Sequence, residues 1–206
     1  MNELQASTTI MENVFLLIAV LIPLVGSLVV MSLKNNPNLR EFTSFCAAVL
    51  LFAVVCSFIP ALKQGHTLVY PIFHLLPGLS ITLRADGFSM IFALVASSLW
   101  MIAVFYSLGY MRAHHEPKQT RFNACFALAI FGAIGVAFSD NLLTLYLFYE
   151  IVSICTYPLV AHHQDEESYE GGRKYIIYLT STAKLFLLPA LALIYVLTGT
   201  LDFPHN

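Results

Sequence analysis

Residues 141–161 read NLLTLYLFYEIVSICTYPLVA, an almost wholly apolar stretch with one carboxylate, Glu150, near its centre. About 20 apolar residues suffice to cross the hydrocarbon core of a bilayer as a helix. An ionised carboxylate costs several kcal/mol at that depth unless other groups compensate its charge. The stretch therefore predicts a transmembrane helix, and Glu150 is the first candidate for a functional residue.

The composition of the whole chain indicates an integral membrane protein. Hydrophobic residues make up 58% of the 206 residues, charged residues make up 11%, and the mean hydropathy is +0.77. Soluble domains carry about 25% charged residues. The formal net charge of −2 gives no electrostatic reason to expect a nucleic acid partner. We expect an all-α membrane fold with six transmembrane helices, at residues 14–33, 42–62, 87–111, 122–138, 142–161 and 175–197.

The distribution of basic residues predicts the orientation in the membrane. Connections from an odd-numbered stretch to the next even-numbered one hold Lys34, Arg40, Arg112, Lys118, Arg121, Arg173 and Lys174. The opposite side holds Lys63 and Arg84. Because cytoplasmic loops carry the excess of Lys and Arg, we expect a multi-pass protein of the cell inner (plasma) membrane with both termini outside. The acidic residues before the first stretch do not match a cleaved signal peptide, so that stretch is expected to be retained.

The four cysteines do not predict a metal site. They are widely separated, lie within apolar stretches and form no Cys-x-x-Cys or Cys/His pattern. Nor does the chain contain a phosphate-binding glycine loop or a nucleotide-binding fingerprint. We therefore expect no metal, no cofactor and no catalytic residue of a soluble-enzyme type.

Polar residues accompany Glu150 on one face of its predicted helix. Tyr146, Glu150, Ser153 and Tyr157 are spaced by four, three and four residues, which places them on one helix face. Such a stripe faces the protein interior or water, because lipid satisfies no hydrogen bonds. These residues are therefore candidates for a path through the membrane.

The last apolar stretch carries a lysine, Lys184, near its centre. Thr180 and Ser181 precede it by four and three residues, and Pro189 follows and loosens the helix beside it. Glu150 and Lys184 are expected near the membrane midplane, within reach of each other or of a shared water chain. Such a pair is a switchable proton relay, or else a static ion pair that fixes helix packing.

Four features outside the helix centres complete the predictions. His162 and His163 follow the Glu150 stretch and could feed protons into the path, or could be ordinary surface residues. Residues 162–174, which read HHQDEESYEGGRK, are expected to form a solvated loop, and Asp140 is expected to cap the Glu150 helix. Residues 63–86 include the alternation LSITL, which predicts a short extended segment.

Residues 139–160 (SDNLLTLYLFYEIVSICTYPLV) resemble the signature segment of antiporter-like subunits. Respiratory complex I, membrane-bound hydrogenases and Mrp-type Na⁺/H⁺ antiporters share this subunit family. Residues 83–92 (LRADGFSMIF) and 172–178 (GRKYIIY) resemble the entries to its third and sixth helices. The segment LTSTAKLFLLP at residues 179–189 looks closest to the D-type members among the antiporter subunits.

The resemblance implies a larger fold of which this chain forms the amino-terminal part. Family members have about fourteen helices built around inverted repeats, and this chain corresponds to the first six. Residues 1–121 would form an amino-terminal three-helix region, and residues 122–206 would begin the proton-translocating repeat. Lys184 is not equated with the lysine of the family's seventh helix. Partners would include other membrane subunits, one of which could supply the missing helices.

The resemblance also implies a role for Glu150, which falls on the family's fifth-helix glutamate. The first hypothesis is a proton-translocating subunit of a redox-driven pump, with Glu150 carrying protons and Lys184 tuning it. Any redox reaction would belong to other subunits, because this chain has no ligands for flavin or iron–sulfur clusters. The alternatives are a subunit of a Na⁺/H⁺ antiporter, and a structural subunit or truncated fragment that conducts no ions.

Overall fold

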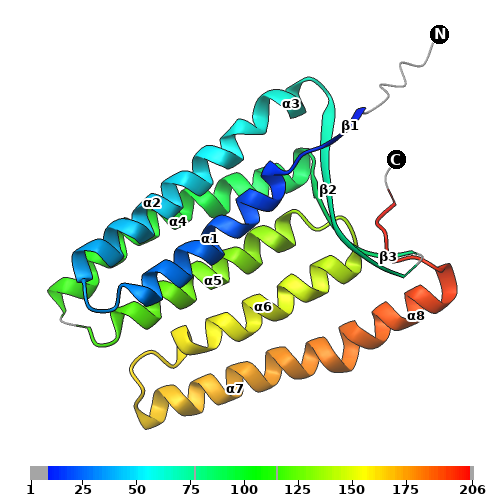
Figure 1. Ribbon diagram of the computed structural model, residues 1–206. Coiled ribbons are helices and arrows are strands. Elements are labelled where there is room, and N and C mark those ends of the chain that lie inside the picture. Colours follow the sequence, from blue (N-terminus) through cyan, green and yellow to red (C-terminus); the bar gives the residue numbers. More distant parts are fainter. Residues whose placement is uncertain (1–8, 77, 115, 205–206) are drawn as a thin grey trace.

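The computed structural model describes residues 9–76, 78–114 and 116–204, which form an elongated helical bundle (Figure 1). Within these residues, six helical segments are long and apolar enough to cross a membrane, as the sequence predicts. The helices are α1 (Phe15–Ser32), α2 (Pro37–Ser57), α3 (Ile59–Lys63), α4 (Gly87–Ala113), α5 (Gln119–Ala137), α6 (Leu142–Val160), α7 (Glu166–Thr182) and α8 (Leu188–Thr198). Between α7 and α8, Ala183–Leu187 (η1) form a π-helical turn.

The long helices pack mainly against their neighbours in sequence. In addition, α1 lies against α5, and α2 lies against α4, so that α1, α2, α4, α5 and α6 share one apolar core. Trp100, Phe58, Phe138, Leu16 and Leu51 are among its fully buried side chains. The continuous helix α7–η1–α8 contacts mainly α6 and lies at one side of the bundle (Figure 1). Only 11% of its most apolar window is buried, against 39% for α1.

A small sheet at one end of the bundle makes the fold less purely α-helical than expected. The strands are β1 (Thr9–Glu12), β2 (His66–Leu76) and β3 (Leu79–Ala85), in the order β1-β2-β3. β2 and β3 form an antiparallel hairpin, and β1 adds to β2 in parallel. Gly78 connects the hairpin strands with a φ of +75°, which a glycine adopts without strain. The predicted extended segment is confirmed, but its extent and the pairing of β1 were not foreseen.

The polar run 162–174 is not a solvated loop throughout, because α7 begins at Glu166. Asp165 caps the helix by accepting a 2.7 Å hydrogen bond from the Ser168 backbone N–H. Glu166 and Glu167 occupy the first turn, where carboxylates interact favourably with the helix dipole. These end effects extend the last transmembrane helix beyond its apolar stretch.

The expected cap of α6 is also wrong by one residue. Asn141, rather than Asp140, accepts the Thr144 backbone N–H at 2.8 Å, and its amide donates to the carbonyl of Ser80 on β3 at 2.9 Å. Asp140 instead lies 3.7 Å from the guanidinium of Arg84. The start of the Glu150 helix is therefore fixed both by its own cap and by the sheet.

Candidate functional site

Glu150 lies near the middle of α6, which packs between α5 and α7. The residue as a whole is half-buried, and its Oε1 atom is inaccessible to solvent with no hydrogen-bond partner among the described residues. Buried polar atoms in folded proteins nearly always have a partner. The Oε1 atom of Glu150 thus differs from the hydroxyl groups of Ser153 and Thr156 on the same helix, which are hydrogen-bonded.

The polar stripe of α6 lies toward the inside of the bundle. Tyr146 is 9% exposed and Ser153 is 3% exposed, while Tyr157 is half-buried and packs against Gly172 on α7. The Ser153 hydroxyl donates to the Tyr149 carbonyl at 3.0 Å. Tyr146 and Ser153 are thus buried, Glu150 and Tyr157 are half-buried, and this face of α6 packs largely against the rest of the bundle.

Lys184 lies in the π-helical turn η1, where the sequence predicts a loosened helix. It stands at about the level of Glu150, because Tyr149 lines a pocket together with Ala183 and Phe186. Its side chain is exposed, however, since Ala183 occupies the side that faces α6. Within the described residues, no ion pair connects Lys184 to Glu150 or to another carboxylate.

The polar residues before Lys184 are divided between the two sides of α7. Thr180 is half-buried and Ser181 is exposed. The direct link from α7 to α6 is made instead by Tyr175, whose hydroxyl lies 2.7 Å from the hydroxyl of Thr156. No pattern in the sequence predicts this bond, because Thr156 lies off the Glu150 stripe and the register of the two helices is a tertiary property.

At the end of α6, His162 and His163 meet Glu116 from the α4–α5 connection. Glu116 Oε2 lies 3.8 Å from His162 Nε2 and 3.7 Å from His163 Nδ1. His162 is 8% exposed and neither ring nitrogen has a hydrogen-bond partner among the described residues. Burial, together with the Arg121 charge, holds the pKa of His162 below its usual value, although Glu116 opposes this shift. The sequence did not predict a role for Glu116. It lies in a loop, and the sequence of a loop does not show which helix end the loop contacts.

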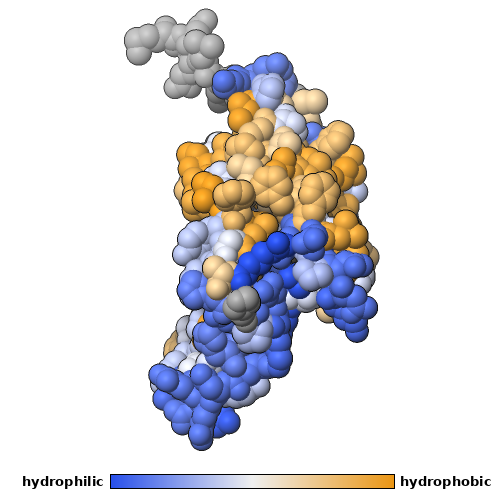
Figure 2. Space-filling model, turned by 90° about the vertical axis from the view of Figure 1, so that its left-hand side faces the viewer, coloured by the Kyte–Doolittle hydropathy of each residue, from blue (hydrophilic) through white to orange (hydrophobic). Residues whose placement is uncertain are grey.

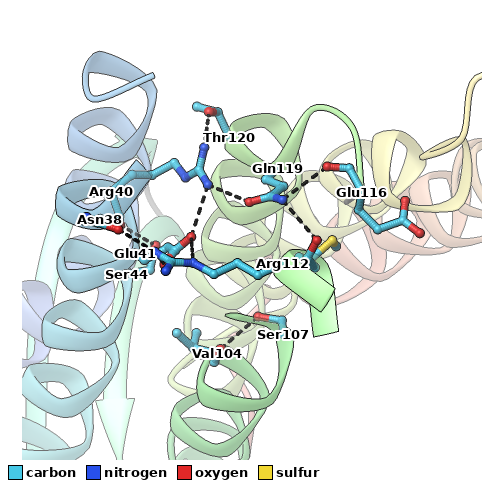
Figure 3. A network of polar contacts seen from close by, with 11 residues as sticks. Asn38, Arg40, Glu41, Ser44, Val104, Ser107, Arg112, Glu116, Gln119 and Thr120 are labelled. Atoms are coloured by element: carbon cyan, nitrogen blue, oxygen red, sulfur yellow. Dashed lines mark hydrogen bonds and ion pairs between the residues drawn. The ribbon is translucent and has the colours of Figure 1, made fainter. Parts of the chain in front are cut away.

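A second polar cluster ties α2, α4 and α5 together at this end of the bundle (Figure 3). Arg112 binds both carboxylate oxygens of Glu41, with Nε 3.1 Å from Oε1 and Nη2 in contact with Oε2. Arg40 donates to Thr120 Oγ1 at 2.9 Å and to Gln119 Oε1 at 2.8 Å, and lies 3.4 Å from Glu41. In the sequence, Arg40 and Arg112 indicated only which side of the membrane their loops face. The adjacent opposite charges of Arg40 and Glu41 at a helix end were the one signal that could have predicted an ion pair here.

The side chains that line this side of α6 include groups that can bind and release protons. Among the described residues, no group of three or more His, Cys, Asp and Glu side chains is placed to hold a metal ion. Carboxyl, hydroxyl and imidazole groups can each both accept and donate a hydrogen bond in one of their protonation states. They follow α6 from Glu116 and the histidines at its end to Glu150 at its centre.

Two family profiles match the chain in succession. Residues 77–123 match the profile described as NADH-Ubiquinone oxidoreductase (complex I), chain 5 N-terminus. Residues 139–205, which include α6 and the α7–η1–α8 helix, match the profile described as NADH:quinone oxidoreductase/Mrp antiporter, TM. The chain belongs to the family of antiporter-like membrane subunits.

Relatives of this antiporter-like subunit carry the names of bacterial antiporter subunits. It is 24% identical over 191 residues to the putative antiporter subunit mnhA2 of Staphylococcus aureus (strain MRSA252), covering 92% of this chain and 24% of that protein. It is 29% identical over 182 residues to the A1 subunit of a Na(+)/H(+) antiporter from Staphylococcus haemolyticus (strain JCSC1435), covering 86% and 22%. The chain therefore spans about a quarter of the length of these curated relatives. Both carry A-type names, so the finer placement near the D-type members stays a prediction.

Solved structures share the fold of this antiporter-like subunit. The membrane-bound sulfane sulfur reductase, an archaeal respiratory membrane complex, contains a chain that matches with a TM-score of 0.81 at 24% identity. The match covers 92% of this chain and 39% of that one. The Mrp complex from Dietzia sp. DQ12-45-1b matches with a TM-score of 0.78 at 22% identity, covering 92% and 35%. The expected fold, with six membrane-spanning helices that match part of these larger chains, is thus confirmed.

Proposed function

We propose that this antiporter-like subunit moves protons through the membrane and that Glu150 takes up and releases them. The observation that carries the proposal is the buried Oε1 atom of Glu150, which has no partner among the described residues at the centre of α6. Ionisable residues within transmembrane helices are rare and mark ion pathways or proton relays. A carboxyl group that binds a proton gains a donor and loses its charge, so Glu150 can alternate between two hydrogen-bonding states.

The proposed path follows α6. It would begin at His162 and His163, and would reach Glu150 past Tyr157 and Ser153, with Tyr146 beyond it. Thr180 and Ser181 would contribute from α7. The buried position of Ser153 and the Thr156–Tyr175 hydrogen bond support a continuous polar track between the two helices. Water would fill the intervals, because buried waters bind where polar groups lack partners.

Lys184 would act on Glu150 as a charge rather than through a hydrogen bond. The two residues lie at similar levels on neighbouring helices, and Lys184 has no ion-pair partner among the described residues. Charges interact strongly over several ångströms where water is excluded. A change in the surroundings of Lys184 would therefore alter how readily Glu150 holds its proton.

The protein would work within a multisubunit assembly. Both fold neighbours are chains of membrane complexes, which supports partners that are themselves membrane subunits, including one that supplies further helices. We propose location in the cell inner membrane with both termini outside, as the basic residues indicate. The division of the fold at residues 121 and 122 stays a prediction.

The names of the relatives favour a second candidate, in which proton movement is exchanged for Na⁺ or K⁺ rather than driven by a redox reaction. Relatives include the A1 subunit of a Na(+)/H(+) antiporter and a probable K(+)/H(+) antiporter protein of Rhizobium meliloti (strain 1021). The fold match to a respiratory complex supports the redox-driven hypothesis. Both hypotheses use the same proton site.

The test is proton movement in liposomes that contain the intact assembly, followed with a pH-sensitive dye. Glu150→Gln should assemble normally and abolish proton movement, because the amide cannot be deprotonated. Glu166→Gln, an exposed carboxylate in the first turn of α7, is the matched control and should leave transport unchanged. Proton movement that starts on adding Na⁺ or K⁺ indicates exchange, whereas a requirement for an electron donor indicates a redox pump.

Unchanged proton movement in Glu150→Gln would reject the proposal and leave a structural role. A double variant with apolar residues at positions 150 and 184 separates the same alternatives. A purely structural pair tolerates joint replacement. Retained proton transport in the double variant would therefore show that the two residues serve only in helix packing.

A further inference from the structure

A polar pocket of about 410 Å³ opens at the end of the bundle where α2 and α5 begin and α4 ends. We infer that it binds the phosphate headgroup of an anionic phospholipid. The inference does not depend on the proton path, because none of its arguments involves Glu150 or Lys184. The volume falls in the range of ligand-binding clefts, about 300–1,000 Å³. The lining residues are Pro37, Arg40, Glu41, Arg112, Glu116, Lys118, Gln119 and Thr120.

Basic groups outnumber acidic ones in this headgroup pocket. Arg40, Arg112 and Lys118 line it, and Glu41 is shared between the two arginines. Glu116 also belongs to the lining, but its carboxylate faces His162 and His163. Figure 3 shows that carboxylate turned away from Arg40 and Arg112. The pocket therefore keeps an excess of positive charge for an anion.

Donors remain available after the internal hydrogen bonds are made. Arg40 is only 5% exposed, and its Nε atom has no acceptor among the described residues. The Arg112 side chain is 53% exposed. Its Nε and Nη2 atoms bind Glu41 and Asn38, and its Nη1 atom can donate to a further anion. Guanidinium groups bind phosphate oxygens in a bidentate manner.

Two helix N-termini add to the positive potential. α2 and α5 start at this pocket, and neither has a side-chain cap at its N-cap residue, Asn36 or Lys118. The first turn of a helix presents unpaired N–H groups and a partial positive charge, which favour phosphate. Because α2 begins with Pro37, which has no N–H, more of these donors come from α5. Together with the arginines, these ends give the pocket the chemistry of a phosphate site.

Its place in the membrane identifies the source of the phosphate as a lipid. The pocket lies where three helices that are long and apolar enough to cross a membrane begin or end. We therefore place it at the level of the headgroups. In Figure 2, which views this end of the bundle, hydrophilic side chains cover the lower part and apolar surface adjoins them. Basic pockets between transmembrane helices bind anionic headgroups while the acyl chains follow the apolar surface beside them.

Lys118 offers a variant that changes the pocket without breaking the Glu41 network. Its side chain is exposed, and its backbone has a φ of +54°, which asparagine tolerates. Lys118→Asn removes one charge, whereas Lys118→Arg keeps it. Lys34→Asn is the matched control, because Lys34 is an exposed lysine in the α1–α2 turn at the same end and does not line the pocket.

The experiment measures lipid retention by native mass spectrometry after the intact assembly is purified in mild detergent with added phosphatidylglycerol or phosphatidylcholine. We expect wild type, Lys118→Arg and Lys34→Asn to retain phosphatidylglycerol in preference to phosphatidylcholine. Lys118→Asn should lower the affinity for phosphatidylglycerol about tenfold, the effect of one charge-assisted contact. Excess inorganic phosphate should not displace the lipid.

Three results would overturn the inference. Equal losses in Lys118→Asn and Lys34→Asn would mean that the lipid responds to overall charge and not to this pocket. Equal retention of phosphatidylcholine would remove the argument from charge. Displacement of the lipid by inorganic phosphate would make the pocket a site for a free anion.

Discussion

Gly135 on α5 lies directly against the ring of Phe148 on α6, so closely that a Cβ atom at position 135 would overlap the ring. One turn earlier, a Cβ at Gly132 would lie 2.6 Å from Val152 Cγ2. Small residues allow transmembrane helices to approach closely. These two glycines therefore set the distance between α5 and the helix that carries Glu150.

We predict that Gly135→Ala destabilises the protein by about 1–3 kcal/mol, because the added methyl group forces Phe148 or the helices apart. Thermal unfolding in detergent measures the effect. Gly109→Ala in α4 is the control, since a Cβ there meets nothing within 4 Å, and it should be neutral or slightly stabilising. Equal melting temperatures for both variants would show that the α5–α6 contact adapts without cost.

The hydroxyl–hydroxyl bond between Thr156 and Tyr175 should couple α6 to α7. Interhelical hydrogen bonds in membranes contribute about 0.6 kcal/mol on average and at most about 1.7. We predict a coupling energy in this range from a double-mutant cycle with Thr156→Val and Tyr175→Phe, measured by unfolding in detergent. Additive effects of the two substitutions would indicate that each hydroxyl is satisfied elsewhere.

The Glu41 carboxylate should be the most sensitive member of its cluster. Its side chain is 8% exposed and it faces both Arg40 and Arg112. Breaking a buried ion pair by removing one partner costs about 3–5 kcal/mol, and the exposure of Arg112 places Glu41→Gln at the lower end. Denaturant unfolding measures this loss.

The control for Glu41 is Glu170→Gln, because Glu170 and Lys174 form an exposed ion pair in α7. Exposed pairs contribute little to stability, so this variant should unfold like wild type. A similar loss in both variants would contradict a special role for the buried cluster.

The protein should become less stable as the pH falls, because His162 becomes protonated. Its pKa is lowered in the folded protein, chiefly by burial, so the unfolded chain binds a proton at higher pH than the folded one. Stability therefore decreases as the pH falls below about 6.5, the ordinary pKa of histidine. Unfolding curves between neutral and mildly acidic pH measure the slope, which His162→Gln should reduce.

His163→Gln serves as the comparison for His162, because its ring is largely exposed. This variant should keep most of the wild-type pH dependence. If the pH dependence of stability persisted in His162→Gln and disappeared in His163→Gln, the prediction would be wrong and the effect would belong to His163.

Sequence reasoning located the helices because hydrophobicity is a local property. Each predicted stretch falls largely within one of the six long helical segments, and the loosened turn beside Lys184 appears as η1. Helix ends were less certain, since single hydrogen bonds decide them. The hydrogen bond from the Ser168 N–H to Asp165 starts α7 before the predicted stretch. The N-cap of α6 is Asn141, whereas the sequence had predicted Asp140.

Hydropathy and single charges along the chain were enough to establish a helical membrane protein with a carboxylate and a lysine near the middle of two spans. The cost of placing charge and unpaired backbone groups in lipid leaves few other solutions. The contacts of those residues, in contrast, emerged from the packed bundle alone. Packing left Glu150 Oε1 without a partner among the described residues, placed Lys184 on an exposed face, and brought Glu116 to the histidines. Such contacts depend on the rotation and register of packed helices, which side chains distant in the sequence fix together.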